Sequence, residues 1–311
     1  MVTNNIFIRM EAFEVKYIAY KILFKLIRIL RISNLLSDMT YLKLNYYILI
    51  RKKLDLDNPK TFNEKLNWLK LYDRKPIYST MVDKYEAKIY FANIIGEKYI
   101  IPTLGVYDKF EDIDFDKLPN QFVIKCTHDS GGLVICKDKS KLDVSMARKK
   151  INKLLKKNYY YQCREWPYKN VTPRIIIEKY MNDSNNDDLR DYKFFCFNGE
   201  PKYMKVDFDR QTNHRANYYD MNFKLQHFGE MVCPPDYNKK IDKPQNFNTM
   251  VEFARKLSKD IPFLRVDFYN IDGKIYFGEL TFYPAAGLGK FIPEEWDLKL
   301  GKLLNLPKRD K

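Results

Sequence analysis

A change of pattern near residue 120 limits the fold more than any other feature of this sequence. The chain before it has apolar residues at helical spacing, whereas the chain after it has short apolar runs separated by turns, which predict β-strands. Asn198-Gly199 and Asp272-Gly273 each lie between two such runs, and these dipeptides favour tight hairpins, so at least part of the sheet is expected to be antiparallel. The predicted strands are residues 122–126, 133–136, 175–180, 192–197, 203–208, 264–269 and 275–280.

Helix signals dominate the earlier part of the chain. Thr61 is followed three residues later by Glu64, which is the pattern of a capping box, and it comes soon after the helix-breaking Asp57-Asn58-Pro59. Residues 99–102 are expected to form a short strand or an extended entry into the next part. Helices are predicted at residues 42–53, from 61 onwards, 82–94, 145–155 and 248–258. An α+β body behind a helical N-terminal region follows.

The N-terminal region combines an amphipathic pattern with positive charge. Apolar residues recur at helical spacing over residues 15–30, and Lys21, Lys25 and Arg28 share the other face. Residues 1–53 contain ten Lys or Arg against three Asp or Glu, which is a large part of the formal net charge of +15. Such a helix could dock on the protein with its basic side in solvent, or it could lie on an anionic membrane surface.

Several classes of protein are excluded by composition. The five cysteines are widely spaced and form no C-x-x-C pair, so neither a disulfide framework nor a zinc knuckle is expected, and a cytoplasmic location fits best. Charges interrupt the apolar residues 6–32, which argues against a signal peptide or a membrane span. Aromatic RNA-binding signatures and a helix-turn-helix pattern are missing from the sequence, so nucleic acid is not expected as a partner.

A predicted strand that ends in Lys125 leads into a small polar loop with glycines. Loop amides that approach an anion closely, beside a lysine on a strand, can hold phosphate. The order of residues matches neither the Walker A loop nor G-x-G-x-x-G. His128 is either part of this loop site or a residue that hydrogen-bonds the loop. The candidate residues are Lys125, His128, Ser130, Gly131 and Gly132.

Polar residues also follow the strand predicted at residues 175–180. Backbone groups there can bind the edge of an adenine, with Tyr180 and Met181 beside it, although core packing explains the isoleucines equally well. The candidates are Glu178, Lys179, Tyr180 and Met181.

The hairpin around Asp272-Gly273 should place Asp267 and Glu279 close together, with Arg265, Asp267 and Tyr269 on one face. Paired carboxylates suit Mg²⁺, which prefers oxygen ligands, whereas the alternative is two solvated strand residues.

The polar segment after the strand at residues 203–208 has three interpretations. It could face a second substrate, or it could be a solvated loop with salt bridges. Asp207-x-Asp209 also resembles the D-x-D metal site of nucleotide-sugar glycosyltransferases. The candidate substrate residues are Asp207, Arg210, Asn213 and His214.

The order of these motifs resembles the ATP-grasp superfamily. Lys125 with its glycine loop is followed by I-I-I-E-K-Y, D-Y-K, R-V-D-F and E-L-T-x-x-P, in which Thr281 stands where many members have Asn. The segments N-P-K-T-F-N-E-K, K-C-T-H, D-Y-K-F-F-C-F-N-G and G-E-L-T-F-Y are similar to the teichuronopeptide-biosynthesis (TupA-like) branch, from about residue 37 to the end. Members of that branch often occur with capsule and exopolysaccharide enzymes.

The resemblance implies two α+β lobes that enclose ATP. Residues 1–55 would be the basic helical region, 56–110 a segment before the core, 111–185 the small lobe and 186–311 the large lobe. Lys125, and with less support Lys84, would contact phosphates, and Glu178 to Met181 would hold adenine and ribose.

The remaining implied roles concern the reaction. Lys193 would reach the γ-phosphate, Arg265 would stabilise the reacting centre, and Asp267, Glu279 and Thr281 would hold Mg²⁺. The implied enzyme is a ligase that joins an amine, such as an amino acid, to a carboxylate of a glycan or lipid-linked glycan. A glycosyltransferase and a phosphotransferase on the same fold are the alternatives. Such an acceptor would place the protein in the cytoplasm, at the inner face of the cell membrane.

Overall fold

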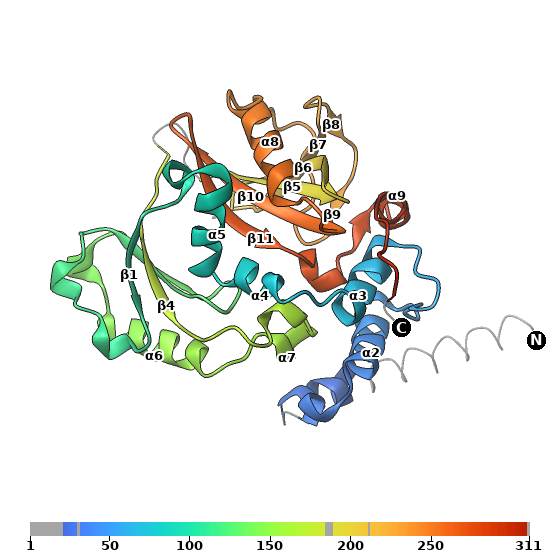
Figure 1. Cartoon of the computed structure of the whole chain (residues 1–311), viewed down its shortest axis with the longest axis horizontal. Coiled ribbons are helices and arrows are strands. Elements are labelled where there is room, and N and C mark those ends of the chain that lie inside the picture. The colour runs from blue at the N-terminus through green and yellow to red at the C-terminus, as the bar shows by residue number, and fades with distance from the viewer. Residues whose placement is uncertain (1–20, 30–31, 184–188, 211, 310–311) are drawn as a thin grey trace, which may run out of the picture.

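Two antiparallel sheets form the body of the protein (Figure 1). The computed structural model describes residues 21–29, 32–183, 189–210 and 212–309. The small sheet has the strand order β1-β4-β2-β3 and the large sheet the order β11-β10-β5-β6-β7-β8. A two-stranded sheet pairs β9 (Gly229–Glu230) with β12 (Phe291–Ile292).

The small sheet is built from β1 (Thr103–Tyr107), β2 (Phe122–Cys126), β3 (Leu133–Cys136) and β4 (Ile175–Lys179). Helix α6 (Val144–Leu155) covers it, and a separate apolar cluster forms between them that includes Phe122, Ile124, Ile151 and Ile177. Strands β2, β3 and β4 confirm the sequence prediction within one residue. Residues 99–102 do not form the short strand that was one of two alternatives, because Tyr99 ends a 3₁₀ turn (Glu97–Tyr99) and β1 begins only at Thr103; Ile100 has extended backbone angles, as the other alternative expects.

The large sheet contributes buried side chains from both of its faces to the main core. Helix α8 (Phe247–Leu257) packs against β5, β6 and β10, and buries Phe253, Ala254 and Leu257. Its strands are β5 (Asp191–Phe197), β6 (Glu200–Phe208), β7 (Arg215–Asp220), β8 (Leu225–Gln226), β10 (Phe263–Ile271) and β11 (Lys274–Thr281). Strands β7 and β8 were not predicted.

Two turns fix the register of this sheet. Asn198 and Gly199 have φ of 51° and 84°, and Asp272 and Gly273 have φ of 49° and 74°. Positive φ at both central residues is the conformation that matches the twist of paired strands, and Asn, Asp and Gly adopt it most easily. The two predicted hairpins are confirmed, as β5–β6 and β10–β11.

The helical N-terminal region packs on the large lobe. Its elements are a helix over residues 21–29, a 3₁₀ turn at Ile32–Leu35, α2 (Asp38–Ile50), α3 (Phe62–Tyr72), α4 (Ile77–Val82) and α5 (Glu86–Ile95). The predicted capping box is present, since Thr61 Oγ1 accepts from Glu64 N at 3.2 Å and Glu64 Oε2 accepts from Thr61 N at 2.9 Å. Helix α3 also contacts the C-terminal α9 (Glu295–Leu303).

The helix predicted over residues 82–94 is divided in the structure. Asp83 Oδ1 accepts from the backbone N–H groups of Tyr85 and Glu86, at 2.8 and 3.1 Å, and starts α5 anew. Between the two helices, Lys84 N donates to Thr127 O at 3.0 Å, so that this point of the chain is attached to the loop after β2. The interruption therefore positions Lys84 beside the predicted phosphate loop.

Part of the predicted amphipathic segment, residues 15–20 and 30, lies outside the described residues. Residues 21–29 are helical as predicted. None of the helices that the structure describes combines the length and apolar character needed to cross a membrane.

Candidate nucleotide and metal site

A cavity of about 500 Å³ lies between the small sheet and the large sheet. The small lobe contributes Lys125 from β2 and the segment Glu178 to Met181 at the end of β4, which are residues predicted to hold the nucleotide. The large lobe contributes Arg210 and Tyr269. Nucleotide sites are concave, largely apolar pockets with a few polar groups, and this cavity meets that description.

Glu178 is the buried centre of a charge triplet in this cavity. Its Oε2 lies 2.5 Å from Lys125 Nζ, and its Oε1 pairs with Lys88 Nζ, which also donates to Ile101 O at 2.7 Å. Burial by itself would raise the pKa of Glu178, but the two lysines hold this pKa at about 2. The carboxylate is therefore charged at neutral pH and holds Lys125 in the cavity.

Acid is expected to remove the stabilisation that this triplet provides. An unfolded glutamate has a pKa near 4.5, so the contribution is complete above about pH 4.5 and is lost as the pH falls toward about 2. A shift of this size corresponds to about 3 kcal/mol. Urea unfolding measured across this pH range should show a steeper loss of unfolding free energy for the wild type than for Glu178→Gln. Parallel pH profiles of the two proteins would contradict the assignment.

The loop after β2 curls tightly beside Lys84. Lys84 Nζ donates to Cys126 O at 3.0 Å and also to Asp129 O, and Gly131 has a φ of 83°. A Cβ at Gly132 would lie 2.2 Å from Asp129 Oδ2 and 2.6 Å from Leu154 Cδ1, so a larger residue there would have to displace these two side chains.

The outer edge of this loop is available to a ligand, whereas His128 is not. Ser130 and Gly131 are exposed, which suits a loop that binds an anion through its amides. His128 is buried, and its Nε2 lies 3.3 Å from Leu154 O and 3.1 Å from Lys157 O. The His128 ring therefore contacts backbone carbonyls at the C-terminal end of α6, which agrees with the interpretation of His128 as a residue that hydrogen-bonds the loop region.

Asp267 and Glu279 are directly opposite one another on β10 and β11, as predicted. Arg265 Nε and Nη2 donate to the two oxygens of Asp267 at 2.7 and 2.6 Å, and Nη2 donates to Glu279 Oε1 at 2.9 Å. Burial raises the pKa of Asp267 to about 6, against the pull of Arg265 and Lys193. The two carboxylates converge on the Arg265 guanidinium, and carboxylate oxygens are the ligands that Mg²⁺ prefers.

Thr281 and Lys193 complete this row of the large sheet. Thr281 pairs with Arg265 in the register, and Lys193 of β5 pairs with Asp267 on its other side. Lys193 Nζ donates to Asp207 Oδ2, and it lies 3.4 Å from Asp191. The predicted catalytic and metal residues are therefore neighbours on one sheet, although their roles stay predictions.

Of the four predicted substrate residues, Asp207 and His214 contact each other, whereas Arg210 and Asn213 differ in their surroundings. Arg210 lines the nucleotide cavity and pairs with Asp191, and Asn213 is exposed. His214 Nε2 lies 3.0 Å from Asp207 Oδ1, and Asp207 is buried.

A D-x-D metal site does not fit this arrangement. Asp207 is engaged by Lys193 and lies 3.8 Å from Lys205, while both oxygens of Asp209 accept from Lys239 at 3.1 Å. Asp207, His214 and Cys233 have ligand atoms within 4.8 Å of one another, but the two ammonium groups beside Asp207 disfavour a metal ion there.

Sequence reasoning missed Lys88, Asp191 and Arg210 as parts of the nucleotide cavity or its border. Lys88 lies four residues after Lys84, and Asp191 begins the D-Y-K motif, so both carried a weak signal. Arg210 was predicted to bind substrate, yet it faces the same cavity as Glu178.

A nucleotide-sized cavity between two antiparallel sheets, with lysines on one sheet and paired carboxylates on the other, defines an ATP-grasp fold of the α+β class. The chain belongs to the TupA-like ATP-grasp family, whose sequence model matches residues 64–305. No curated protein matches the chain.

Solved structures of ATP-grasp enzymes are distantly similar. The D-alanine–D-alanine ligase of Bacillus anthracis is 17% identical with a TM-score of 0.38, and the match covers 65% of this chain and 57% of that one. The N5-carboxyaminoimidazole synthetase of Staphylococcus aureus is 15% identical with a TM-score of 0.38, covering 65% and 44%. The Helicobacter pylori D-alanine–D-alanine ligase is 12% identical with a TM-score of 0.40, covering 74% and 60%. The chain thus spans less than two thirds of the length of each of these enzymes.

Proposed function

We propose that this protein is an ATP- and Mg²⁺-dependent ligase that joins an amine, such as an amino acid, to a carboxylate of a cell-surface polysaccharide precursor. The observation that carries the proposal is the position of two sets of groups. Lys125 and the segment Glu178 to Met181 line the cavity, while Glu279, opposite Asp267 on the large sheet, lines a smaller pocket together with Lys84 and Asp129. Family membership supports ATP as the nucleotide.

Each residue has a task in this proposal. Lys125 and Lys84 neutralise phosphate oxygens, and Glu178 keeps Lys125 aimed into the cavity. Asp267 and Glu279, with Thr281 beside them, would hold Mg²⁺, which neutralises charge on the transferring phosphoryl group. Arg265 pairs with both carboxylates in the structure, and its guanidinium would stabilise negative charge on the reacting carboxylate when the two carboxylates hold Mg²⁺.

The proposed reaction has two steps, phosphorylation of the acceptor carboxylate and displacement of phosphate by the amine. A carboxylate oxygen of the acceptor attacks the γ-phosphorus, and ADP leaves with the bonding electrons. The amine nitrogen then attacks the acyl carbon, the bond from this carbon to the phosphate oxygen breaks, and the proton lost by the nitrogen leaves with the phosphate. Lys193, which pairs with Asp267 in the register, would balance charge on the phosphoryl group.

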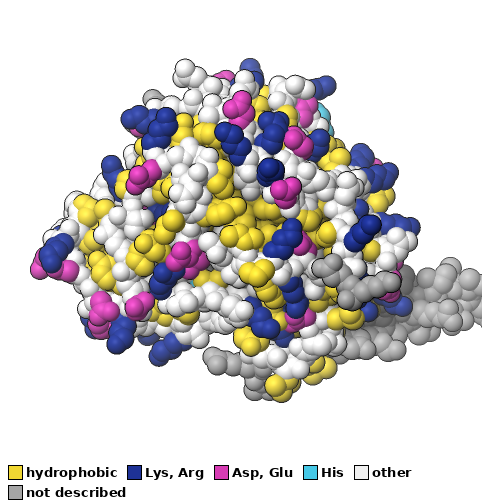
Figure 2. Space-filling model, in the orientation of Figure 1, with side chains coloured by type: hydrophobic (Ala, Val, Ile, Leu, Met, Phe, Trp, Pro, Cys, Tyr) yellow, Lys and Arg dark blue, Asp and Glu magenta, His cyan; other side chains and the backbone are white. Residues whose placement is uncertain are grey.

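An anionic glycan agrees with the charge of the protein. Figure 2 shows Lys and Arg side chains over both lobes on the visible face, and the chain has a formal net charge of +15. A positive surface raises the local concentration of acidic substrates. Uronic-acid glycans are therefore the acceptors to test first, and we place the reaction in the cytoplasm, beside the inner membrane face on which lipid-linked glycans are built.

Product analysis tests the proposed reaction. With ATP, Mg²⁺, uronic-acid glycans and amino acids, a ligase should release ADP and free phosphate in equal amounts, and only when the amine is present. The acceptor mass should rise by that of the amino acid minus water. Phosphate left on the acceptor would show a phosphotransferase instead. Sugar transfer from a nucleotide sugar would show a glycosyltransferase.

A further inference from the structure

The helix over residues 21–29 exposes an apolar surface. Ile22, Leu23, Leu26 and Ile29, here called the apolar ridge, are 56%, 53%, 49% and 65% exposed. The opposite side is anchored by Phe24, which is 4% exposed and lies 5.4 Å from Tyr41 of α2 between ring centroids. The helix is therefore held through one narrow side, and its apolar ridge faces outward.

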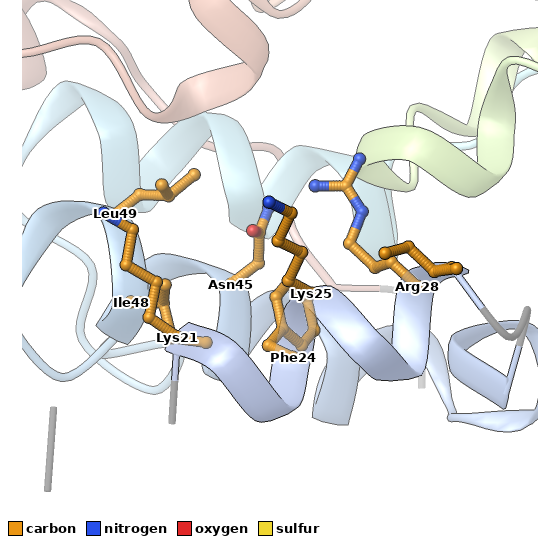
Figure 3. A pocket seen from close by; sticks show the side chains of 8 residues that line it. Lys21, Phe24, Lys25, Arg28, Asn45, Ile48 and Leu49 are labelled. Atoms are coloured by element: carbon orange, nitrogen blue, oxygen red, sulfur yellow. The ribbon is translucent and has the colours of Figure 1, made fainter. Parts of the chain in front are cut away.

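A pocket of about 460 Å³ lies between this helix and α2 (Figure 3). Lys21, Lys25 and Arg28 line it together with the apolar side chains of Phe24, Ile48 and Leu49. In Figure 3, Lys25 and Arg28 leave the helix on the side of α2. The three basic residues are exposed, as expected for a helix that docks on the protein, but most of the apolar side is exposed as well and only Phe24 is buried.

Asn45 shows that the pocket is built for an acceptor. It lines the pocket and is only 2% exposed, yet its Nδ2 has no acceptor among the residues that the structure describes. A buried donor without a partner costs free energy, and such donors usually have a partner when a site is filled. The pocket lining, within the described part of the chain, contains three cations and no carboxylate. An anion that accepts hydrogen bonds, such as a phosphate, satisfies both features.

The position of Ile29 indicates what carries the phosphate. Ile29 lines the pocket and also belongs to the apolar ridge, so the anion site opens onto an apolar surface. An amphiphile with a charged head and apolar chains fits this continuity, whereas a free nucleotide or sugar phosphate has no use for the ridge. Resting on the proposed location beside the membrane, we propose that this pocket binds the phosphate headgroup of an anionic membrane lipid while the apolar ridge enters the bilayer interface.

Vesicle binding by the full-length protein tests the proposal. Vesicles of phosphatidylcholine with added phosphatidylglycerol should bind the protein, and pure phosphatidylcholine should bind it far more weakly. Lys25→Gln with Arg28→Gln should weaken binding roughly 30-fold, at about fivefold for each lost charge. Lys149→Gln with Lys153→Gln, two exposed lysines of α6, removes the same charge elsewhere and should have little effect.

Asn45→Leu separates a built pocket from general attraction between charges. This variant keeps every charge, so a phosphate site predicts about a tenfold weaker binding to the anionic vesicles. Its melting temperature should be unchanged or higher, because the unpaired donor is gone. Unchanged binding by a folded Asn45→Leu variant would overturn the pocket.

The apolar ridge has its own control. Leu26→Ser should weaken vesicle binding, whereas Met146→Ser, which alters a methionine of α6 that is 67% exposed, should not. A concentration-dependent dimer that Leu26→Ser dissociates, with no vesicle binding by the wild type, would assign the ridge to a second copy and overturn the proposal. ADP release with a soluble acceptor should persist in all these variants. Loss of vesicle binding therefore stays distinct from failure of the proposed ligase activity.

Discussion

Glu279→Gln is expected to lower ATP turnover by about 10²–10³-fold while the protein stays folded. The side chain of Glu279 is 50% exposed, so its charge adds little to folding, but it lies opposite Asp267 where both carboxylates converge. Loss of one oxygen ligand leaves Mg²⁺ poorly held across the transferring phosphate. Turnover measured as ADP release over a range of Mg²⁺ concentrations should show both a lower maximum and a weaker response to the metal ion.

Glu200→Gln is a close control for this change. Glu200 also bonds an arginine, Arg255, and its side chain is 49% exposed, but it lies at the far end of β6 from the metal residues. This variant should keep wild-type turnover. Asp267→Asn should resemble Glu279→Gln in its effect on turnover. Sugar transfer that survives Asp267→Asn would contradict the ATP-grasp assignment of the site.

Lys125→Ala should weaken ATP binding by about 10–100-fold, which is the range for loss of a hydrogen bond between charged groups. Lys125 lines the cavity and pairs with Glu178, and Glu178 keeps Lys88 as a second partner when Lys125 is removed. The carboxylate is therefore not left without a counter-charge, and the variant should fold. Calorimetric titration with ATP and ADP, with Mg²⁺ present, measures the effect.

Lys137 provides the matched control for Lys125. It lines the same cavity but is exposed, and no ion pair with Glu178 is present for it. Lys137→Ala should change ATP affinity much less than Lys125→Ala does. Equal losses for the two variants would mean that only the general positive charge of the cavity matters, and unchanged affinity in Lys125→Ala would remove the lysine from the site.

Local chemistry made much of the large sheet predictable. Asn198-Gly199 and Asp272-Gly273 adopt positive φ, which few other pairs adopt at low cost, so the two hairpins followed from four residues. The second hairpin then placed Asp267 opposite Glu279 without further information. The capping box of Thr61 and Glu64 is equally local, because its two hydrogen bonds span three residues.

Other features depended on packing between distant segments. The amphipathic pattern placed Lys21, Lys25 and Arg28 on one side of a helix, but only the anchoring of Phe24 on Tyr41 turned that side toward a pocket. The sequence likewise gave no sign that Asp83 would divide α4 from α5. The orientation of a helix and the position of its ends depend on tertiary contacts, because the fold adopts the arrangement that buries the more favourable face.

The sequence by itself determined the hairpins, the helix start at Thr61 and the neighbouring carboxylates, since each rests on conformations and hydrogen bonds within a short stretch of chain. The tertiary structure alone brought Lys88 of α5 to Glu178 of β4, and Arg210 and Tyr269 into the cavity with Lys125. These residues are far apart in the sequence, and no local pattern encodes a contact between two lobes. The physical reason is that desolvation and charge pairing act on whichever groups the packed sheets place side by side.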